Sequence, residues 1–208
     1  MLFRSQQPRI AELLAALAQV NGVRWIRLLY CHPRGISREL IETIRDEPVI
    51  CKYLDMAIEH ADDAVLAKMN RRITQAHLRE RIAALRREIP GIALRTSVIV
   101  GFPTETEANV ETLLQFLREI RFERLGAFTY SQEEGSASFQ YPDQVPETIR
   151  QQRFDRLMQL QQEIAAELTA QAIGTTREVV IDERDATDPS QYLEIGRASC
   201  RERVCQYV

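Results

Sequence analysis

The sequence predicts an α/β protein with a parallel sheet, because short apolar runs alternate with segments of helical periodicity and the connections between them are short. The clearest unit lies at residues 95–106, where the apolar run 95–100 meets Gly101 and Pro103 and a helical pattern follows. A strand that ends in such a loop and then enters a helix is typical of a βα unit, whose ligands bind beyond the carboxyl end of the strand. The pattern alone leaves open whether the sheet is open or closed into a barrel.

Composition narrows the class of protein. The chain has 208 residues, 45% of them hydrophobic, which is enough to bury a core. Its net charge of −3 argues against a nucleic-acid clamp that relies on bulk positive charge. No apolar stretch approaches the roughly 20 residues that cross a bilayer, and no signal-peptide pattern opens the chain, so we expect a cytoplasmic protein with no membrane partner.

The elements of the first half follow from periodicity and caps. A helix is predicted over residues 8–20, where apolar residues recur at helical spacing until Asn21 and Gly22. Ser37 and Asp62 are placed to cap two short helices. The remaining expected elements are strands at 23–30 and 53–58 and a longer helix at 74–88.

In the second half of the chain, the alternation of strands and helices ends and a long helix follows. A strand at 95–100, a helix at 106–120 and a strand at 125–130 complete the alternating pattern. Pro146 is placed as the first residue of a long helix that runs to about residue 172, and Gly174 ends it. Residues 177–182 then begin a strand of a different unit.

The cysteines and the tail predict no metal site. Cys31 and Cys51 belong to no C-x-x-C cluster, so reduced thiols are expected. Residues 194–208, which include Cys200 and Cys205, have no periodicity and resemble the conceptual translation of a sequencing-adapter oligonucleotide. We expect this tail to belong to no element of the fold.

Five blocks of the sequence, taken in chain order, resemble the radical S-adenosylmethionine (SAM) methylthiotransferase family. Three positions depart from its usual residues: Ala57 replaces Pro, Glu59 replaces Gln and Thr104 replaces Gly. The blocks are residues 25–33, 53–72, 95–106, 126–135 and 142–146.

The resemblance implies an activity. The loop E-E-G at 133–135 and the form H-A-D at 60–62 resemble the RimO-type branch, which methylthiolates an aspartate of a small-subunit ribosomal protein. The alternatives are a tRNA-directed, MiaB-like methylthiotransferase and an inactive truncated product. An ordinary (β/α) enzyme without iron–sulfur chemistry is a further alternative.

The resemblance also implies an organisation. Residues 1–145 would form a partial (β/α) barrel of the radical SAM type, supplying its strands three to six. Residues 146–174 would be a connector helix, and 175–193 the start of a truncated TRAM domain. The family uses S-adenosyl-L-methionine and two 4Fe–4S clusters, but its C-x-x-x-C-x-x-C loop is not in this sequence. We therefore expect an inactive internal fragment of an enzyme that is a monomer when full length, with no catalytic residue of its own.

By the same resemblance, part of the S-adenosylmethionine pocket falls in this chain. Glu59 and His60 follow a strand, where a carboxylate can accept bonds from ribose hydroxyls or the amino group. The ordinary alternatives are a surface loop for Glu59 and His60, a solvated helix-end charge for Arg71, a strand-start charge at the barrel bottom for Arg95, a turn glycine for Gly101 and simple packing for Tyr130. The full set of expected cofactor-binding residues adds two arginines for the methionyl carboxylate, a stretch near adenine and a tyrosine at a strand end: Glu59, His60, Arg71, Arg95, Val100, Gly101, Phe102 and Tyr130.

Overall fold

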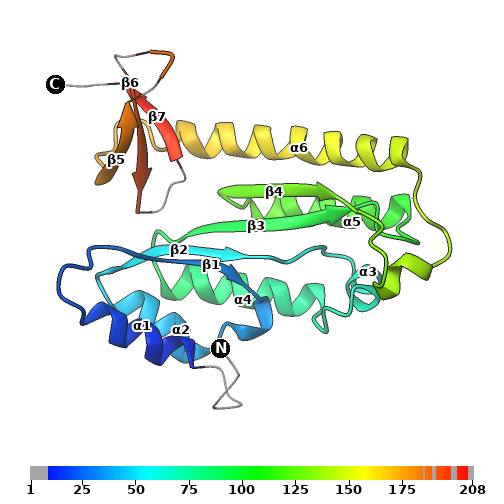
Figure 1. Ribbon diagram of the computed structural model, residues 1–208, viewed down its shortest axis with the longest axis horizontal. Coiled ribbons are helices and arrows are strands. Elements are labelled where there is room, and N and C mark those ends of the chain that lie inside the picture. The colour runs from blue at the N-terminus through cyan, green and yellow to red at the C-terminus, as the bar shows by residue number, and fades with distance from the viewer. Residues whose placement is uncertain (1–8, 185, 189–190, 198–200, 206–208) are drawn as a thin grey trace.

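Two sheets form the framework of the computed structural model, which describes residues 9–184, 186–188, 191–197 and 201–205 (Figure 1). The larger sheet has four parallel strands in the order β1-β2-β3-β4, and the smaller has three antiparallel strands in the order β5-β6-β7. The strands are β1 (Ile26–Cys31), β2 (Ile50–Met56), β3 (Ala93–Val100), β4 (Arg124–Thr129), β5 (Val179–Arg184), β6 (Gln191–Gly196) and β7 (Arg201–Cys205). The parallel sheet confirms the predicted α/β class.

Helices precede the first parallel strand, connect the strands and follow the last of them. They are α1 (Ile10–Ala18), α2 (Arg38–Asp46), α3 (Asp63–Lys68), α4 (Gln75–Glu88), α5 (Glu107–Ile120) and α6 (Glu147–Ala170), with 3-10 turns η1 (Pro33–Gly35) and η2 (Ala137–Gln140). Pro8, the predicted start of the first helix, lies outside the described residues. Pro146 is the N-cap of α6 and not its first helical residue, because its ψ of 145° is extended.

Side-chain caps explain where four of these helices begin. Ser37 Oγ accepts from the Leu40 amide at 3.2 Å, and Asp62 caps α3, so both predicted caps are confirmed. Thr74 caps α4, and Thr106 forms a capping box with Asn109 at the start of α5. Each cap satisfies amides that have no partner inside the helix.

The main core lies between the parallel sheet and its helices. Alternate strand residues such as Leu28, Leu54 and Leu94 are buried against apolar stripes of α2, α4 and α5. Helix α6 packs along β4 and α5 and adds Leu157 and Ile164 to the buried residues (Figure 1).

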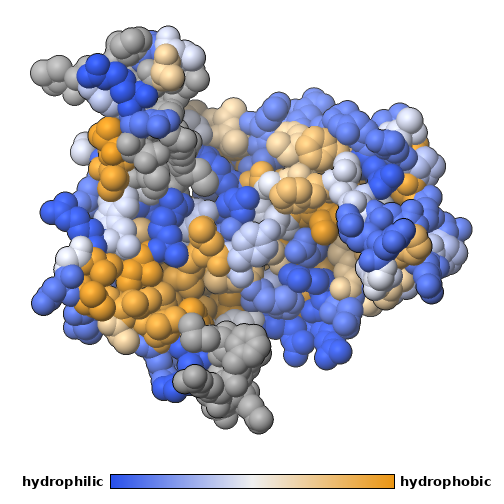
Figure 2. All heavy atoms as spheres, in the orientation of Figure 1, coloured by the Kyte–Doolittle hydropathy of each residue, from blue (hydrophilic) through white to orange (hydrophobic). Residues whose placement is uncertain are grey.

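The opposite face of the parallel sheet is partly open; we call it the open face. It bears Arg27, Leu29, Tyr53, Asp55, Arg95 and Phe128, which alternate with the core residues. Leu29 is 63% exposed and Phe128 is 52% exposed. Figure 2 shows apolar side chains gathered at the surface on the side of the molecule where α1, β1 and β2 lie.

The tail prediction is wrong in part. Strand β6 crosses the predicted boundary at residue 194, and β7 lies within the tail and pairs with β6. Neighbouring antiparallel strands join through backbone hydrogen bonds, which do not require a periodic side-chain pattern. Cys200 lies outside the described residues. Among the helices that the structure describes, none is long and apolar enough to span a bilayer.

Candidate functional site

The carboxyl ends of β1 to β4 lie together at one end of the parallel sheet, which we call the mouth (Figure 1). Three residues just at or beyond these ends have left-handed backbone: Tyr30 at a φ of 62°, Glu59 at 67° and Gly101 at 77°. Such conformations are costly for residues other than glycine and concentrate at binding sites. The mouth is therefore where sequence and backbone both indicate a ligand.

Glu59 and Arg71, two of the expected cofactor-binding residues, meet at the mouth. The Glu59 amide donates to Ser97 O at 3.0 Å and its carbonyl accepts from Ile99 at 2.8 Å, so its backbone is fixed to β3. Its carboxylate lies 4.0 Å from Arg71 Nη1. Burial raises the pKa of Glu59, and the Arg71 charge only partly opposes this.

The guanidinium of Arg71 makes a hydrogen bond at one nitrogen and has another nitrogen without a partner. Its Nη2 donates to the Ala57 carbonyl, while its buried Nε has no hydrogen-bond partner among the described residues. Burial lowers the pKa of Arg71, and the Glu59 charge acts in the opposite direction. A half-buried guanidinium with a free donor fits a ligand that brings an acceptor such as a carboxylate.

Two residues of this region were missed by sequence reasoning. His32 lies close enough to Arg71 for that charge, with burial as the larger cause, to lower the pKa of the imidazole. Cys31 ends β1, and burial first, then the Asp55 charge, raises the pKa of its thiol to about 11. Their only signal in the sequence was their position in the loop after a strand.

His60 does not face the mouth, because its side chain is fully buried. Its Nδ1 accepts from the Asp62 amide at 2.9 Å, and its Nε2 lies 3.4 Å from Glu105 Oε2. Glu105 accepts from the Gly101 amide at 2.9 Å and from Arg153 of α6 at 2.9 Å. His60 and Glu105 therefore support the strand-end loops from behind.

Phe102 and Tyr130 form part of an aromatic cluster beside the mouth. The Phe102 ring packs edge-on against Tyr130 at 5.3 Å and against Tyr141 at 6.1 Å, measured between ring centroids. The Tyr130 hydroxyl donates to Ser138 at 2.9 Å. Phe102 and Tyr130 are nearly buried, so in this structure they mainly shape the loops.

Gly101 and Val100 are occupied by internal contacts. A Cβ on Gly101 would lie 2.1 Å from Cγ of Arg150, so this glycine gives room to α6 as well as supplying a positive φ. The Val100 side chain belongs to the main core. The space beside Gly101 is therefore filled by the protein itself and not free for an adenine.

Arg95 lies in the middle of the sheet, away from the mouth. It is the third residue of β3, and on the open face its Nη1 contacts Asp55 Oδ2 at 2.7 Å. Asp55 is buried, so this carboxylate balances the guanidinium in a region of low polarity. The structure brings Glu59 and Arg71 together but separates Arg95 from them.

The residues do not fit an iron–sulfur cluster. Among those that the structure describes, no group of three or more His, Cys, Asp or Glu side chains is placed to hold a metal ion. A 4Fe–4S cluster requires several cysteine thiolates on one site. The described residues therefore supply no ligand set for such a cluster.

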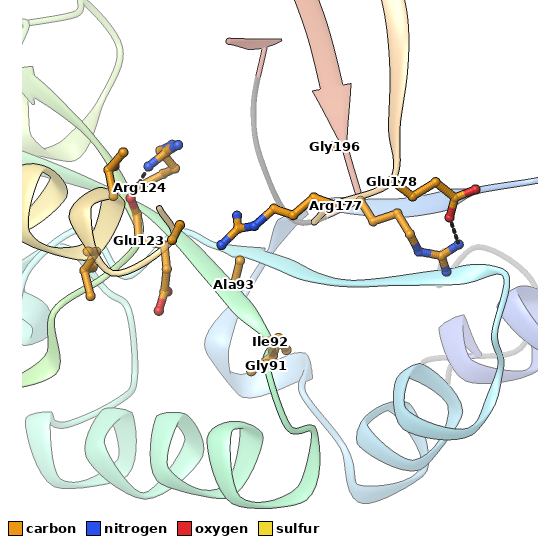
Figure 3. A pocket seen from close by; sticks show the side chains of 12 residues that line it. Gly91, Ile92, Ala93, Glu123, Arg124, Arg177, Glu178 and Gly196 are labelled. Carbon is orange, nitrogen blue, oxygen red and sulfur yellow. Dashed lines mark hydrogen bonds and ion pairs between the residues drawn. The ribbon is translucent and has the colours of Figure 1, made fainter. Parts of the chain in front are cut away.

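A cavity of about 530 Å³ lies at the other end of the sheet, beside the amino ends of β3 and β4 (Figure 3). Arg124 and Glu123 line it from the sheet, and Arg177 and Glu178 line it from the segment that leads into β5. Because parallel α/β sheets bind ligands at the carboxyl ends of their strands, this cavity is not our candidate site.

Most of this chain is similar in sequence to curated proteins of one name. The chain is 45% identical over 192 residues to the ribosomal protein uS12 methylthiotransferase RimO of Geobacter sulfurreducens, which covers 92% of this chain and 42% of that protein. The protein of the same name from Desulfitobacterium hafniense is 49% identical over 175 residues, 84% of this chain and 39% of that protein. The chain thus spans about two fifths of these relatives.

A solved structure shows the same fold. The radical SAM enzyme coproporphyrinogen III oxidase (HemN) from Escherichia coli superposes with a TM-score of 0.56 at 23% identity, covering 80% of this chain and 38% of that one. The sequence profile of the radical SAM superfamily matches residues 3–117, more than half of the chain. This chain belongs to the radical SAM superfamily.

Proposed function

We propose that this chain is part of a RimO-type methylthiotransferase that modifies an aspartate of ribosomal protein uS12. The observation that supports this most directly is the 45% identity over 92% of the chain to a protein of that name. A ribosomal-protein substrate also implies a cytoplasmic enzyme, and we expect it to act as a monomer.

Within this function, the mouth would bind S-adenosylmethionine. Enzymes of the radical SAM superfamily use this cofactor together with a 4Fe–4S cluster, and it supplies the radical that activates the substrate. The Glu59 carboxylate would accept hydrogen bonds from its amino or ribose hydroxyl groups. Arg71, with its unpartnered Nε, would hold the methionyl carboxylate.

The domain assignment extends the same proposal. Residues up to 145 would form a partial radical SAM barrel, α6 would be the connector, and the sheet β5-β6-β7 would contain the beginning of a TRAM domain. The parallel sheet and the antiparallel sheet after α6 support this order.

A chimera tests the function. Residues 9–184 of this chain would replace the matching region of the Geobacter sulfurreducens relative, and the reconstituted protein would be assayed on uS12 and on tRNA. We expect mass spectrometry to find the methylthio group on uS12, and Arg71→Met to weaken S-adenosylmethionine binding. Modification of tRNA alone would favour the tRNA-directed alternative. No modification of either substrate, with the unaltered relative active, would favour the inactive product.

A further inference from the structure

Helix α6 reaches the loops at the mouth through two arginines almost one turn apart. Arg150 donates to the Tyr130 carbonyl at the end of β4, and its side chain fills the space beside Gly101. Arg153 donates from Nη1 to Glu105 Oε1 at 2.9 Å and to the Glu105 carbonyl at 3.2 Å. Both contacts join segments that are far apart in the sequence.

The Glu105 carboxylate is the centre of a buried network. Its side chain is fully buried, Oε1 accepts from the Gly101 amide as well as from Arg153, and Oε2 lies 3.4 Å from His60 Nε2. A buried carboxylate needs a cation and hydrogen-bond donors to replace water. Arg153, itself only 8% exposed in its side chain, supplies that cation from α6.

His60 extends the network to the loop after β2. Its Nδ1 accepts from the Asp62 amide at 2.9 Å, so in the neutral ring Nε2 carries the proton and faces Glu105. Asp62 in turn caps α3, and Glu59 precedes His60 with its left-handed backbone joined to β3. Buried polar contacts therefore lead from α6 to both loops that border the mouth. The step between His60 Nε2 and Glu105 Oε2 is a 3.4 Å approach and not a hydrogen bond, since neither atom has a hydrogen-bond partner among the described residues.

We propose that Arg153 is a positioning residue: through Glu105 and His60 it fixes the loops after β2 and β3, so that α6 sets the geometry of the mouth. Arg150 acts beside it by filling the space at Gly101. The consequence for S-adenosylmethionine rests on the proposed function, whereas the positioning itself does not.

Hydrogen–deuterium exchange on the full chain tests the positioning. In Arg153→Met the Glu105 carboxylate loses its cation, and we expect the amides of Gly101 and Asp62 to exchange about tenfold faster or more. Exchange in the amides of β3 and in α6 itself should change much less. Arg156→Met is the matched control, because Arg156 lies on the same helix but pairs with the exposed Glu107 and Glu111.

Two further measurements separate positioning from general destabilisation. Arg153→Lys keeps the positive charge, so its Gly101 and Asp62 amides should keep most of their protection against exchange. This comparison remains usable if Arg153→Met folds poorly. The nitrogen NMR signals of His60, assigned with His60→Gln, should show an Nε2 proton whose shift moves in Arg153→Met and not in Arg156→Met. Equal exchange in the two methionine variants, or a uniform rise over the whole chain, would overturn the proposal.

The effect of Arg153 on S-adenosylmethionine binding is measured separately by equilibrium dialysis. If the unaltered chain binds the compound, Arg153→Met should raise its Kd by about tenfold, with Arg156→Met unchanged. An unchanged Kd in Arg153→Met would refute the link between α6 and the ligand. If the unaltered chain does not bind it, the proposed binding of S-adenosylmethionine by the residues of this chain alone loses support, and the exchange and NMR results still decide the role of Arg153.

Discussion

Thr104 has a backbone that suits glycine. Its φ is 68°, and the family that the sequence resembles usually has glycine at this position. The amide of Thr104 donates to the Asp143 carbonyl at 3.0 Å, and Lys68 donates to its hydroxyl, so neighbouring segments hold the residue in this conformation. A left-handed backbone costs a β-branched residue about 1–2 kcal/mol.

Thr104→Gly should therefore stabilise the protein. Relief of the left-handed backbone exceeds the added freedom of the unfolded chain, which costs about 0.5–1 kcal/mol, so we expect a net gain of about 0.5–1 kcal/mol. Urea unfolding followed by circular dichroism measures it. Thr112→Gly, within α5, is the control and should lose about 0.3 kcal/mol, the difference in helix propensity between threonine and glycine. A loss in Thr104→Gly would show that the Lys68 contact outweighs the backbone term.

Glu59 makes the free energy of unfolding depend on pH. Burial raises its pKa in the folded state above the ordinary value of 4.5, so the folded protein binds more protons than the unfolded chain between the two values. Stability therefore falls as the pH rises through that window and is constant above it with respect to this group.

Glu59→Gln removes that dependence. We expect the variant to be more stable than the unaltered chain at neutral pH, with the difference vanishing below the ordinary pKa of the carboxyl. Denaturant unfolding at a series of pH values measures the difference. A variant that is less stable at neutral pH would mean that the ion pair with Arg71 outweighs the burial of the carboxylate.

At the scale of elements, the cap of α5 fixes where the loop after β3 ends. Thr106 Oγ1 accepts from the Asn109 amide at 3.4 Å, and the Asn109 side chain accepts from the Thr106 amide at 2.8 Å. Thr106→Ala should cost about 1 kcal/mol, since it removes the oxygen that accepts from the Asn109 amide and leaves only the backbone half of the capping box. Thermal unfolding measures the loss, and Thr112→Ala, at a half-buried position within α5, should lose no stability, because alanine has the higher helix propensity. Equal losses would contradict the role of the cap.

Local signals predicted most of the elements, and long-range contacts explain the exceptions. The caps Ser37 and Asp62 were visible in the sequence because they act within one helical turn. Strand β2 begins at Ile50 and not at residue 53, and Lys52 within it donates from Nζ to the Arg45 carbonyl at 2.7 Å, so its ammonium group is hydrogen-bonded although it lies between buried residues. That contact joins two elements and leaves no local pattern.

In the candidate site, too, local signals were visible in the sequence and long-range contacts were not. Glu59 and Arg71 were each expected in the cofactor pocket from the family resemblance, and the structure brings them within 4.0 Å of each other, a contact that was not predicted. The burial of His60 was not predictable, since its environment depends on Glu105 and, through it, on Arg153, 48 residues farther along the chain. Arg95 was misplaced because only the register with β2 sets it opposite Asp55.

At the scale of the whole molecule, the open face and the edge of the parallel sheet favour association. Strand β1 is at one end of the strand order and pairs with β2 alone among the described strands. Leu29 is 63% exposed on it, and Tyr30, at its end, is 79% exposed. An exposed edge with apolar side chains is a template for contact with another chain.

We therefore expect the chain to associate as its concentration rises, which sedimentation velocity detects as a growing weight-average mass. Leu29→Glu should weaken this association, because a charge on β1 must be desolvated when another chain covers it. Ile173→Glu is the matched control: Ile173 is 83% exposed but lies after α6, far along the chain from the open edge, and should leave the association unchanged. A monomer at every concentration, or an equal effect of the two substitutions, would show that the open edge of β1 does not drive the contact.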